Sequence, residues 1–80
     1  MKYVIMFRYD DDSAGLIEVS ETTTKPEILQ GDFITLEKGE KYHVTNVLFN
    51  HDIYMNRVFV YVMARELNEE EKEFFDTVVG

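Results

Sequence analysis

The stretch RVFVYVMAR at residues 57–65 decides the fold. Its apolar side chains alternate with the period of two that an extended chain imposes, with Val58, Val60 and Val62 on one face and Phe59, Tyr61 and Met63 on the other. β-Branched and aromatic residues favour strands. Because both faces of this segment are apolar, we expect a strand whose two faces are each at least partly covered by the rest of the chain.

The N-terminal third of the chain predicts a hairpin. Residues 2–9 alternate, so that one face carries Tyr3, Ile5, Phe7 and Tyr9 and the other carries Lys2, Val4, Met6 and Arg8. A polar turn follows and ends in Gly15, which adopts positive φ without strain. Residues 16–22 resume β-type side chains, with Ile17 and Val19 on one side.

The next segment is expected to be a connector. Pro26 lacks an amide proton and restricts Lys25, so a central strand cannot continue through it. Residues 27–30 are expected to add a short helical turn. A third strand then directs Ile34 and Leu36 inward.

The fourth strand pattern changes phase. Tyr42 and Val44 share one face, whereas Val47 and Phe49 have the opposite parity. A bulge at residues 45–46 would return all four side chains to the core face and bend the strand. Residues 50–56 are expected to form the loop that leads to the strand at residues 57–65.

The chain ends in a predicted short helix. Asn68 is a favourable N-cap, and its spacing from Glu71 approximates a capping box. Glu69 and Glu70 add negative charge at the positive end of the helix dipole. The apolar residues of this region form one stripe, made of Leu67, Phe74, Phe75 and Val78. We expect this stripe to dock against the sheet and to cover the second face of the strand at residues 57–65.

These elements predict a mainly β (β+α) fold, a five-stranded SH3-like small barrel with a short C-terminal helix. The 80 residues suffice for one small domain, residues 1–80. Closure of the barrel would remove most exposed strand edges. The alternative is a flatter five-stranded sheet with the helix packed across it.

Composition and charge limit the classes of function and partner that the chain can have. The chain has no Cys, so we expect no disulfide, thiolate metal site or thiol nucleophile, and a cytoplasmic location. No apolar run is long enough for a signal peptide or a membrane span, so no membrane partner is expected. Sixteen acidic residues against eight basic ones give a net charge of −8. This field repels nucleic-acid phosphates and favours a protein partner with a basic surface.

Residues 26–62 contain a recurrent order of residues: Pro26, Gly31-Asp32, Ile34, Leu36, the turn at Gly39, Tyr42, Val44, Val47 and then the strand at residues 58–62. This pattern resembles that of many short uncharacterised proteins of phages and bacteria. The resemblance implies an SH3-like small β-barrel and a phage-encoded accessory protein, and it carries no catalytic residues. Peptide-binding SH3 domains are less similar, because the chain lacks their Ala-Leu-Tyr-Asp-Tyr segment and has no Trp.

The sequence favours no candidate for metal or cofactor binding. A calcium loop counted from Asp10 through Asp12 and Glu18 to Glu21 has Ala14 at a ligand position and β-type flanks. His43 and His51 have no metal-ligand spacing. The two serines lie outside any nucleophile motif, and the four glycines are dispersed. We therefore expect no enzyme activity, no catalytic residues, no metal and no cofactor.

Direct binding of nucleic acid is also not expected. The chain has aromatic residues that a base-stacking platform would need: Tyr3, Phe7, Tyr9, Tyr42, Phe59 and Tyr61. Its basic residues, however, are scattered singly and form no stripe along which a phosphate backbone would run. Core packing is the better explanation of these aromatics.

The sequence favours a non-enzymatic acidic protein-binding module, a small phage or bacterial accessory or inhibitor protein. The candidate binding residues form two acidic patches: Asp10, Asp11 and Asp12 in the first turn, and Glu69, Glu70, Glu71, Glu73 and Asp76 in the helix. One alternative is an acidic nucleic-acid mimic that blocks a DNA- or RNA-binding host enzyme. Another is a homo-oligomeric structural subunit whose barrel edge pairs with a copy of itself. The sequence leaves open whether the acidic turn and the helix form one face.

Overall fold

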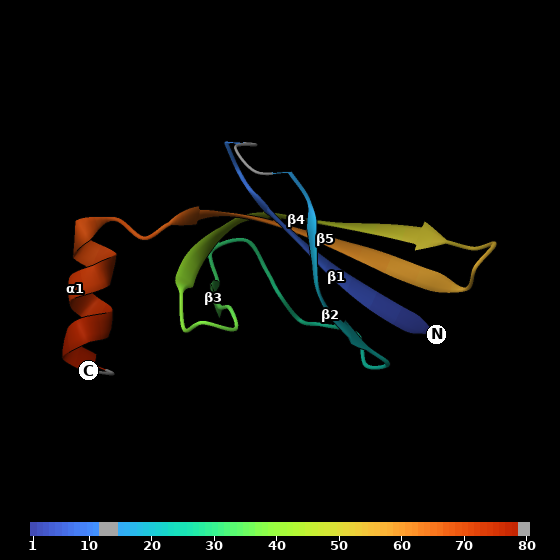
Figure 1. The fold of residues 1–80 in the computed structure, drawn as a ribbon, viewed down its shortest axis with the longest axis horizontal. Coiled ribbons are helices and arrows are strands. Elements are labelled where there is room, and N and C mark those ends of the chain that lie inside the picture. The colour runs from blue at the N-terminus through green and yellow to red at the C-terminus, as the bar shows by residue number, and fades with distance from the viewer. Residues whose placement is uncertain (12–14, 79–80) are drawn as a thin grey trace.

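The computed structural model describes residues 1–11 and 15–78. Five strands form one mixed sheet that curls into a half-barrel, and a helix follows at its end (Figure 1). The elements are β1 (Lys2–Tyr9), β2 (Ile17–Thr22), β3 (Phe33–Thr35), β4 (Lys41–Asp52), β5 (Arg57–Glu66) and α1 (Glu69–Val78). The strand order is β2-β1-β5-β4-β3. The mainly β prediction with five strands and a C-terminal helix is confirmed.

Strand β5 lies at the centre of the sheet. It pairs in parallel with β1 along the whole of that strand, from Lys2 opposite Arg57 to Tyr9 opposite Ala64, and antiparallel with β4. Its inward side chains Val58 and Val60 are fully buried. The prediction of a strand with both faces at least partly covered is confirmed, because its other face is half-buried throughout.

The inner face of the half-barrel holds the core in two adjoining clusters. Val44 and the β5 valines form the first, against which the connector packs Ile28 and β1 packs Tyr3 and Ile5. Phe7, Tyr42 and Ala64 form the second, with Tyr9, Ile34 and Leu36 at its margin. The prediction that Ile34 and Leu36 point inward is therefore confirmed.

A bulge in β4 lies where the phase change predicts it. The register with β5 shifts between Val44 and Asn46, and the extra residue Thr45 donates its hydroxyl to the carbonyl of Met63 at 3.1 Å. Val47 consequently packs on the inner face. The strand continues to Asp52, however, so the predicted loop at residues 50–56 is wrong in its first half.

The short turn that joins β4 to β5 explains this longer hairpin. Residues 53–56 form the turn, and Asn56 adopts the left-handed conformation with φ of 52°, which Asn tolerates. The Asp52 carboxylate accepts the Met55 amide at 3.1 Å and the Arg57 Nε at 3.2 Å. One side chain therefore fixes both the turn and the start of β5.

The connector has no helical turn at residues 27–30, so that prediction is wrong. Instead Leu29 and Asp32 bond reciprocally: the Asp32 carboxylate accepts the Leu29 amide at 2.9 Å, and the Leu29 carbonyl accepts the Asp32 amide at 3.0 Å. Gly31 between them has φ of 96°, a conformation that favours glycine. A side-chain-stabilised turn has displaced the helical one.

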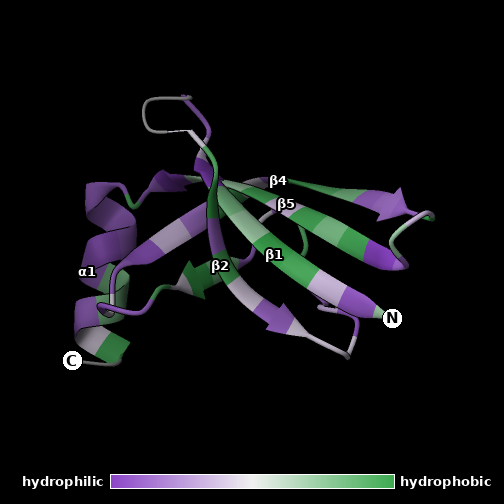
Figure 2. Cartoon of the chain, turned by 45° about the vertical axis from the view of Figure 1, so that its right-hand side comes forward, coloured by the Kyte–Doolittle hydropathy of each residue, from purple (hydrophilic) through white to green (hydrophobic). Residues whose placement is uncertain are grey.

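The outer face of the sheet corrects one prediction, the position of the helix. Val4 is only 3% exposed on this face, so β1 is apolar on both sides. Helix α1 does not cover the outer face of β5: it stands beyond the end of the sheet (Figure 1) and buries no residue of its own. Its aromatic contact with the sheet is made by Phe75, whose ring centroid lies 5.1 Å from that of Phe33. Figure 2 shows that the helix is mostly hydrophilic, whereas the middle parts of β1 and β5 are hydrophobic.

The half-barrel keeps open edges. β2 and β3 are the outer strands of the sheet, and β3 pairs only with residues 41–43 of β4. The expected loss of most exposed edges through closure is therefore wrong for the part of the chain that the structure describes. Within that same part, no helix is long and apolar enough to cross a membrane.

Because the inward side chains of β5 are buried, we expect a charged substitution there to lower the stability of the fold severely. Val60→Asp would place an unpaired carboxylate at a fully buried position, at a cost of several kcal/mol, comparable with the whole stability of a small domain. We expect the variant to be unfolded in circular dichroism and in urea titration. Val19→Asp is the matched control, because Val19 is 40% exposed on the edge strand β2. Equal melting temperatures of parent and Val60→Asp would contradict the fold.

Candidate functional site

Parallel pairing of β1 with β5 brings Asp10 and Asp11, the described part of the first predicted acidic patch, to the end of the strand that leads into the helix. The Asp10 amide donates to the carbonyl of Ala64 at 2.9 Å, so the turn after β1 begins beside the end of β5. Asp10 and Asp11 line a shallow hollow there together with Arg65 and Glu66. Because α1 begins at Glu69, its first turn adjoins the same end.

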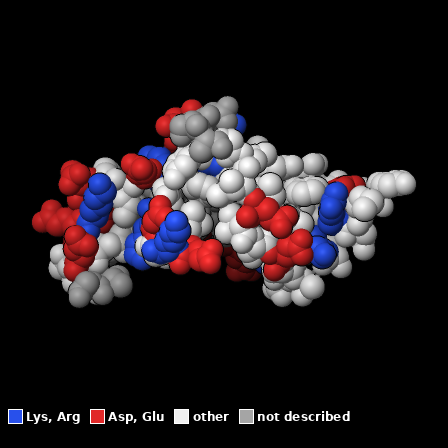
Figure 3. Space-filling model, in the orientation of Figure 1, with Lys and Arg blue, Asp and Glu red and all other residues white. Residues whose placement is uncertain are grey.

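The predicted binding residues divide into three groups. Asp10 and Asp11 are exposed, as are four residues of the helix: Glu69, Glu70, Glu73 and Asp76. Asp12 lies outside the described residues. Glu71 is the exception, since its side chain is only 16% exposed. Figure 3 shows acidic side chains over α1 and the neighbouring end of the sheet, with basic ones among them.

Glu71 binds its own chain on every side. Its carboxylate accepts both guanidinium nitrogens of Arg65 at 2.9 and 3.1 Å, and it lies 2.8 Å from Nδ1 of His43. It also accepts the Asn68 amide at 2.9 Å, while Asn68 Oδ1 accepts the Glu71 amide at 2.8 Å. This reciprocal pair is the predicted capping box, now confirmed. Glu71 therefore attaches the helix to β4 and β5 and is not available to a partner.

The charges around Glu71 stabilise its ionised form. Hydrogen bonds from Arg65, and next from the Asn68 amide, lower the pKa of Glu71 from its ordinary 4.5 to about 2, although burial opposes the shift. The same contact raises the pKa of Arg65. The pair stays charged throughout the neutral range.

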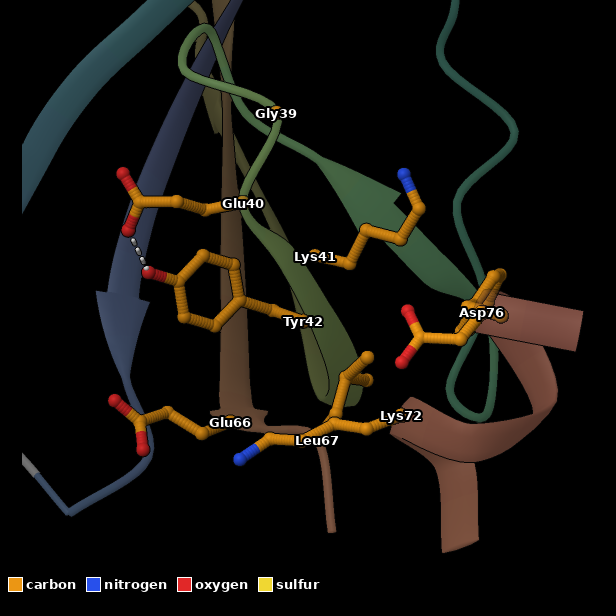
Figure 4. Close-up of a pocket in the computed structure, with 9 residues that line it drawn as sticks. Gly39, Glu40, Lys41, Tyr42, Glu66, Leu67, Lys72 and Asp76 are labelled. Carbon is orange, nitrogen blue, oxygen red and sulfur yellow. Dashed lines mark hydrogen bonds between the residues drawn. The ribbon is translucent and has the colours of Figure 1, made fainter. Parts of the chain in front are cut away.

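A groove of about 600 Å³ lies between the β3–β4 turn, the end of β5 and α1 (Figure 4). Three carboxylates from different elements line it: Glu40 before β4, Glu66 at the end of β5 and Asp76 in α1. Two lysines, Lys41 and Lys72, line it as well. The groove therefore has mixed charge, with an apolar floor contributed by Leu67 and Phe75.

Tyr42 forms the inner wall of this groove and is held by two hydrogen bonds. Its hydroxyl donates to Glu40 Oε2 at 2.8 Å and lies 3.0 Å from the Tyr9 hydroxyl. The bond with Tyr9, followed by burial and by Glu40, raises the pKa of Tyr42 above its ordinary value of 10. A phenol with a raised pKa remains neutral at physiological pH, and this hydroxyl links Tyr9 to Glu40.

The aromatic residues do not form one stacking platform. Phe7, Tyr9 and Tyr42 pack together on the inner face, with ring centroids 5.2 to 5.6 Å apart. Phe59 and Tyr61 stack on the opposite face. Core packing thus accounts for the first three rings.

The histidines are far apart along β4. His43 contacts Glu71. His51 was expected in a loop, but it lies eight residues further along the same strand. Within residues 1–11 and 15–78, no group of three or more His, Cys, Asp or Glu side chains is arranged to hold a metal ion. The acidic segment that was rejected as a calcium loop lies between β1 and β2 in the chain, and neither flanking element is a helix.

Comparison with protein-family models, with curated proteins and with solved structures finds no match to this chain.

The sequence interpretation missed an apolar tip. Ile53, Tyr54 and Met55 in the β4–β5 turn are 84%, 94% and 55% exposed. A run of three large apolar residues in a loop, next to the charged pair Asp52 and Arg57, was the available signal. Loops with such exposure are typical of contact surfaces.

The state of Glu71 predicts a pH dependence. A carboxyl whose folded-state pKa is depressed contributes stability above its ordinary pKa and loses that contribution as the pH falls through the folded-state value. We therefore expect the attachment of α1 to weaken between pH 4.5 and about 2. NMR titration of the Glu71 carboxyl measures its pKa. The Phe33 and Phe75 ring signals, followed in the same titration, report whether the helix stays in contact with the sheet.

Two variants distinguish the loss of the Glu71 contact from the other effects of low pH. Glu71→Gln keeps a side chain suited to the capping box but loses the charge, so the ring signals at neutral pH should resemble those of the parent at low pH. Glu70→Gln removes the same charge from an exposed neighbour and should keep the parent profile. Identical titrations of parent and Glu71→Gln would show that Arg65 does not hold the helix.

Proposed function

We propose that the chain is a non-enzymatic protein-binding module that binds a basic surface of its partner through the acidic end. The acidic end is defined as Asp10, Asp11, Glu66, Glu69 and Glu70. The observation that carries the proposal is the parallel β1–β5 pair, because it gathers carboxylates from two distant parts of the sequence at one end of the sheet.

The basic residues close to this end are already engaged. Arg65 is bound by Glu71 in a two-point contact, and Lys72 lies 3.6 Å from Glu69. Exposed carboxylates therefore carry most of the net charge of −8. Clustered exposed charge of one sign speeds association with an oppositely charged surface.

A general protein-binding module is favoured over a nucleic-acid mimic by the mixed charge of the groove. A mimic of phosphates needs an unbroken series of negative groups, and Lys41 and Lys72 interrupt the carboxylates between the β3–β4 turn and α1. The mimic remains the second candidate because the acidic turn and the first helical turn share one end of the sheet.

Three finer assignments belong to the same proposal. We infer an SH3-like relationship for the half-barrel from its five strands and bulged β4, a phage or bacterial accessory role from the sequence pattern, and a cytoplasmic location from the absence of cysteine. The last two rest on the sequence resemblance and on composition alone.

Charge reversal on the helix tests the acidic end. Glu69→Lys with Glu70→Lys changes the net charge from −8 to −4, since each substitution adds two charges. The loss of favourable dipole interaction costs about 0.3–1 kcal/mol per charge, so the fold should survive. We expect the double variant to recover fewer partners in a pull-down from an extract of the source cells, and the association rate of the parent to fall steeply with salt.

The control reverses equal charge elsewhere. Glu18→Lys with Glu21→Lys also changes the net charge from −8 to −4, but on β2. Loss of the same partners from both double variants would mean that net charge alone matters, which contradicts a localised acidic end. Retention by both would place the binding surface elsewhere. A recovered partner that handles DNA or RNA would favour the mimic.

A further inference from the structure

The second half of β4 has a free edge. On its outer side, β3 pairs with β4 only at residues 41–43, and Gly31 and Asp32 extend this contact as far as Val44. Beyond the bulge, residues 46–52 pair with β5 alone. In the described part of the chain, no other segment forms a backbone hydrogen bond with this edge.

The ladder shows which backbone groups point outward from that edge. The Ala64 carbonyl accepts a hydrogen bond from the Asp10 amide, so the backbone amide and carbonyl of Ala64 point toward β1. Backbone direction alternates along a strand, so Met63, Tyr61 and Phe59 direct theirs toward β4.

The β4 residues opposite these three bond to β5, namely Asn46, Leu48 and Asn50. The amides and carbonyls of the residues between them, Val47, Phe49 and His51, therefore face the open side. The Val47 amide supports this assignment, because it donates to the side chain of Asn46 at 2.9 Å and not to β5.

We propose that a second copy of the chain pairs with this edge, antiparallel and centred on Phe49. In this register Phe49 faces Phe49 of the other copy, and Val47 faces the partner's His51. Val47, Phe49 and His51, whose backbone groups face the open side, then lie opposite residues of the other copy whose backbone groups also face outward. This is the hydrogen-bonded pairing of an antiparallel ladder. The pairing joins two five-stranded sheets into one continuous sheet.

The same register places the exposed hairpin tip against the other copy. β4 ends at Asp52, so the start of the turn at residues 53–56 would lie near the partner's bulge, where Gly31 and Asp32 adjoin Val44. Leu29 in the turn at residues 29–31 is 68% exposed, and Ile53 and Tyr54 are 84% and 94% exposed. One arrangement thus covers two apolar regions that the single chain leaves in solvent.

Charge favours a second copy over a basic peptide as the occupant. Residues 46–51 carry no Asp, Glu, Lys or Arg, and no proline protects the edge. The other free edge, β2, carries Glu18 and Glu21. Helix α1 and the β4–β5 turn lie at opposite ends of the molecule (Figure 1), so the acidic ends of two paired copies point away from each other. The inference does not rest on the proposed basic partner.

Charges introduced at the two-fold position test the register. Phe49→Lys sets two lysines against each other across the proposed axis, so sedimentation velocity should show the 9.5 kDa monomer where the parent forms a dimer. An equal mixture of Phe49→Lys and Phe49→Glu should restore a dimer of one copy of each. Phe74→Lys is the matched control, because Phe74 is 58% exposed on α1 and should leave the parent dimer intact.

A backbone variant tests the edge without adding charge. His51→Pro removes an amide that points away from β5, so it should abolish the dimer while circular dichroism remains that of the parent. A parent that is monomeric over a wide concentration range overturns the proposal. So does a Phe49→Lys variant that remains a homodimer, or a folded His51→Pro variant with an unchanged dimer. A mixture that fails to form the heterodimer overturns the register.

Discussion

The pairing of β5 on both of its edges is the constraint on which the rest of the structure depends. Its inward side chains are buried because β1 and β4 lie on either side of it and the connector and β3 close over the inner face. A parallel neighbour needs a long crossover, and here everything between β1 and β5 serves as one. Tyr3 pairs with Val58, so the core is built from contacts far apart in sequence. Such topologies fold slowly, because chain closure comes before the contacts that stabilise it.

The parallel pair also determines how the acidic residues are used. It brings the end of β1 beside the end of β5, where Arg65 is the available cation. Arg65 engages Glu71, which leaves the carboxylates of Glu69 and Glu70 exposed on the same helical turn. A run of three glutamates thus has two roles: Glu71 holds the helix, and the others face solvent. Composition cannot make this distinction, since it depends on which residue of the run faces the sheet.

Local patterns predicted local structure well. The valines of β5, the phase change at Thr45 and the capping box from Asn68 to Glu71 each depend on neighbouring residues, and each is present. The parallel partner of β5 is a long-range choice that periodicity does not encode, so the sequence left the relation of the acidic turn and the helix open. The connector turn was missed because Asp32 supplies a side-chain bond to Leu29 that competes with a helical turn.

The position of the helix shows why an amphipathic stripe is not sufficient to predict a docking face. β5 ends at Glu66 and α1 begins at Glu69, so only Leu67 and Asn68 are available to reverse the chain. Two residues cannot carry a helix back over the outer face of the strand that precedes it. Glu71 then fixes the helix to Arg65 and His43, and Phe75 reaches Phe33 while Phe74 and Val78 remain exposed.

The two proposed surfaces are compatible because the chain separates charge from apolar exposure. The molecule is 45 Å long, whereas exposed charges are screened over about 10 Å at 0.1 M salt. Carboxylates on α1 therefore exert little repulsion at the β4–β5 hairpin, which lies at the other end of the long axis (Figure 1). The large net charge keeps one end solvated and available to a basic surface, while the uncharged edge of β4 is left free to form backbone hydrogen bonds. Self-pairing through β4 would then present two acidic ends on one assembly, which raises the apparent affinity for any partner with two basic sites that both ends can reach.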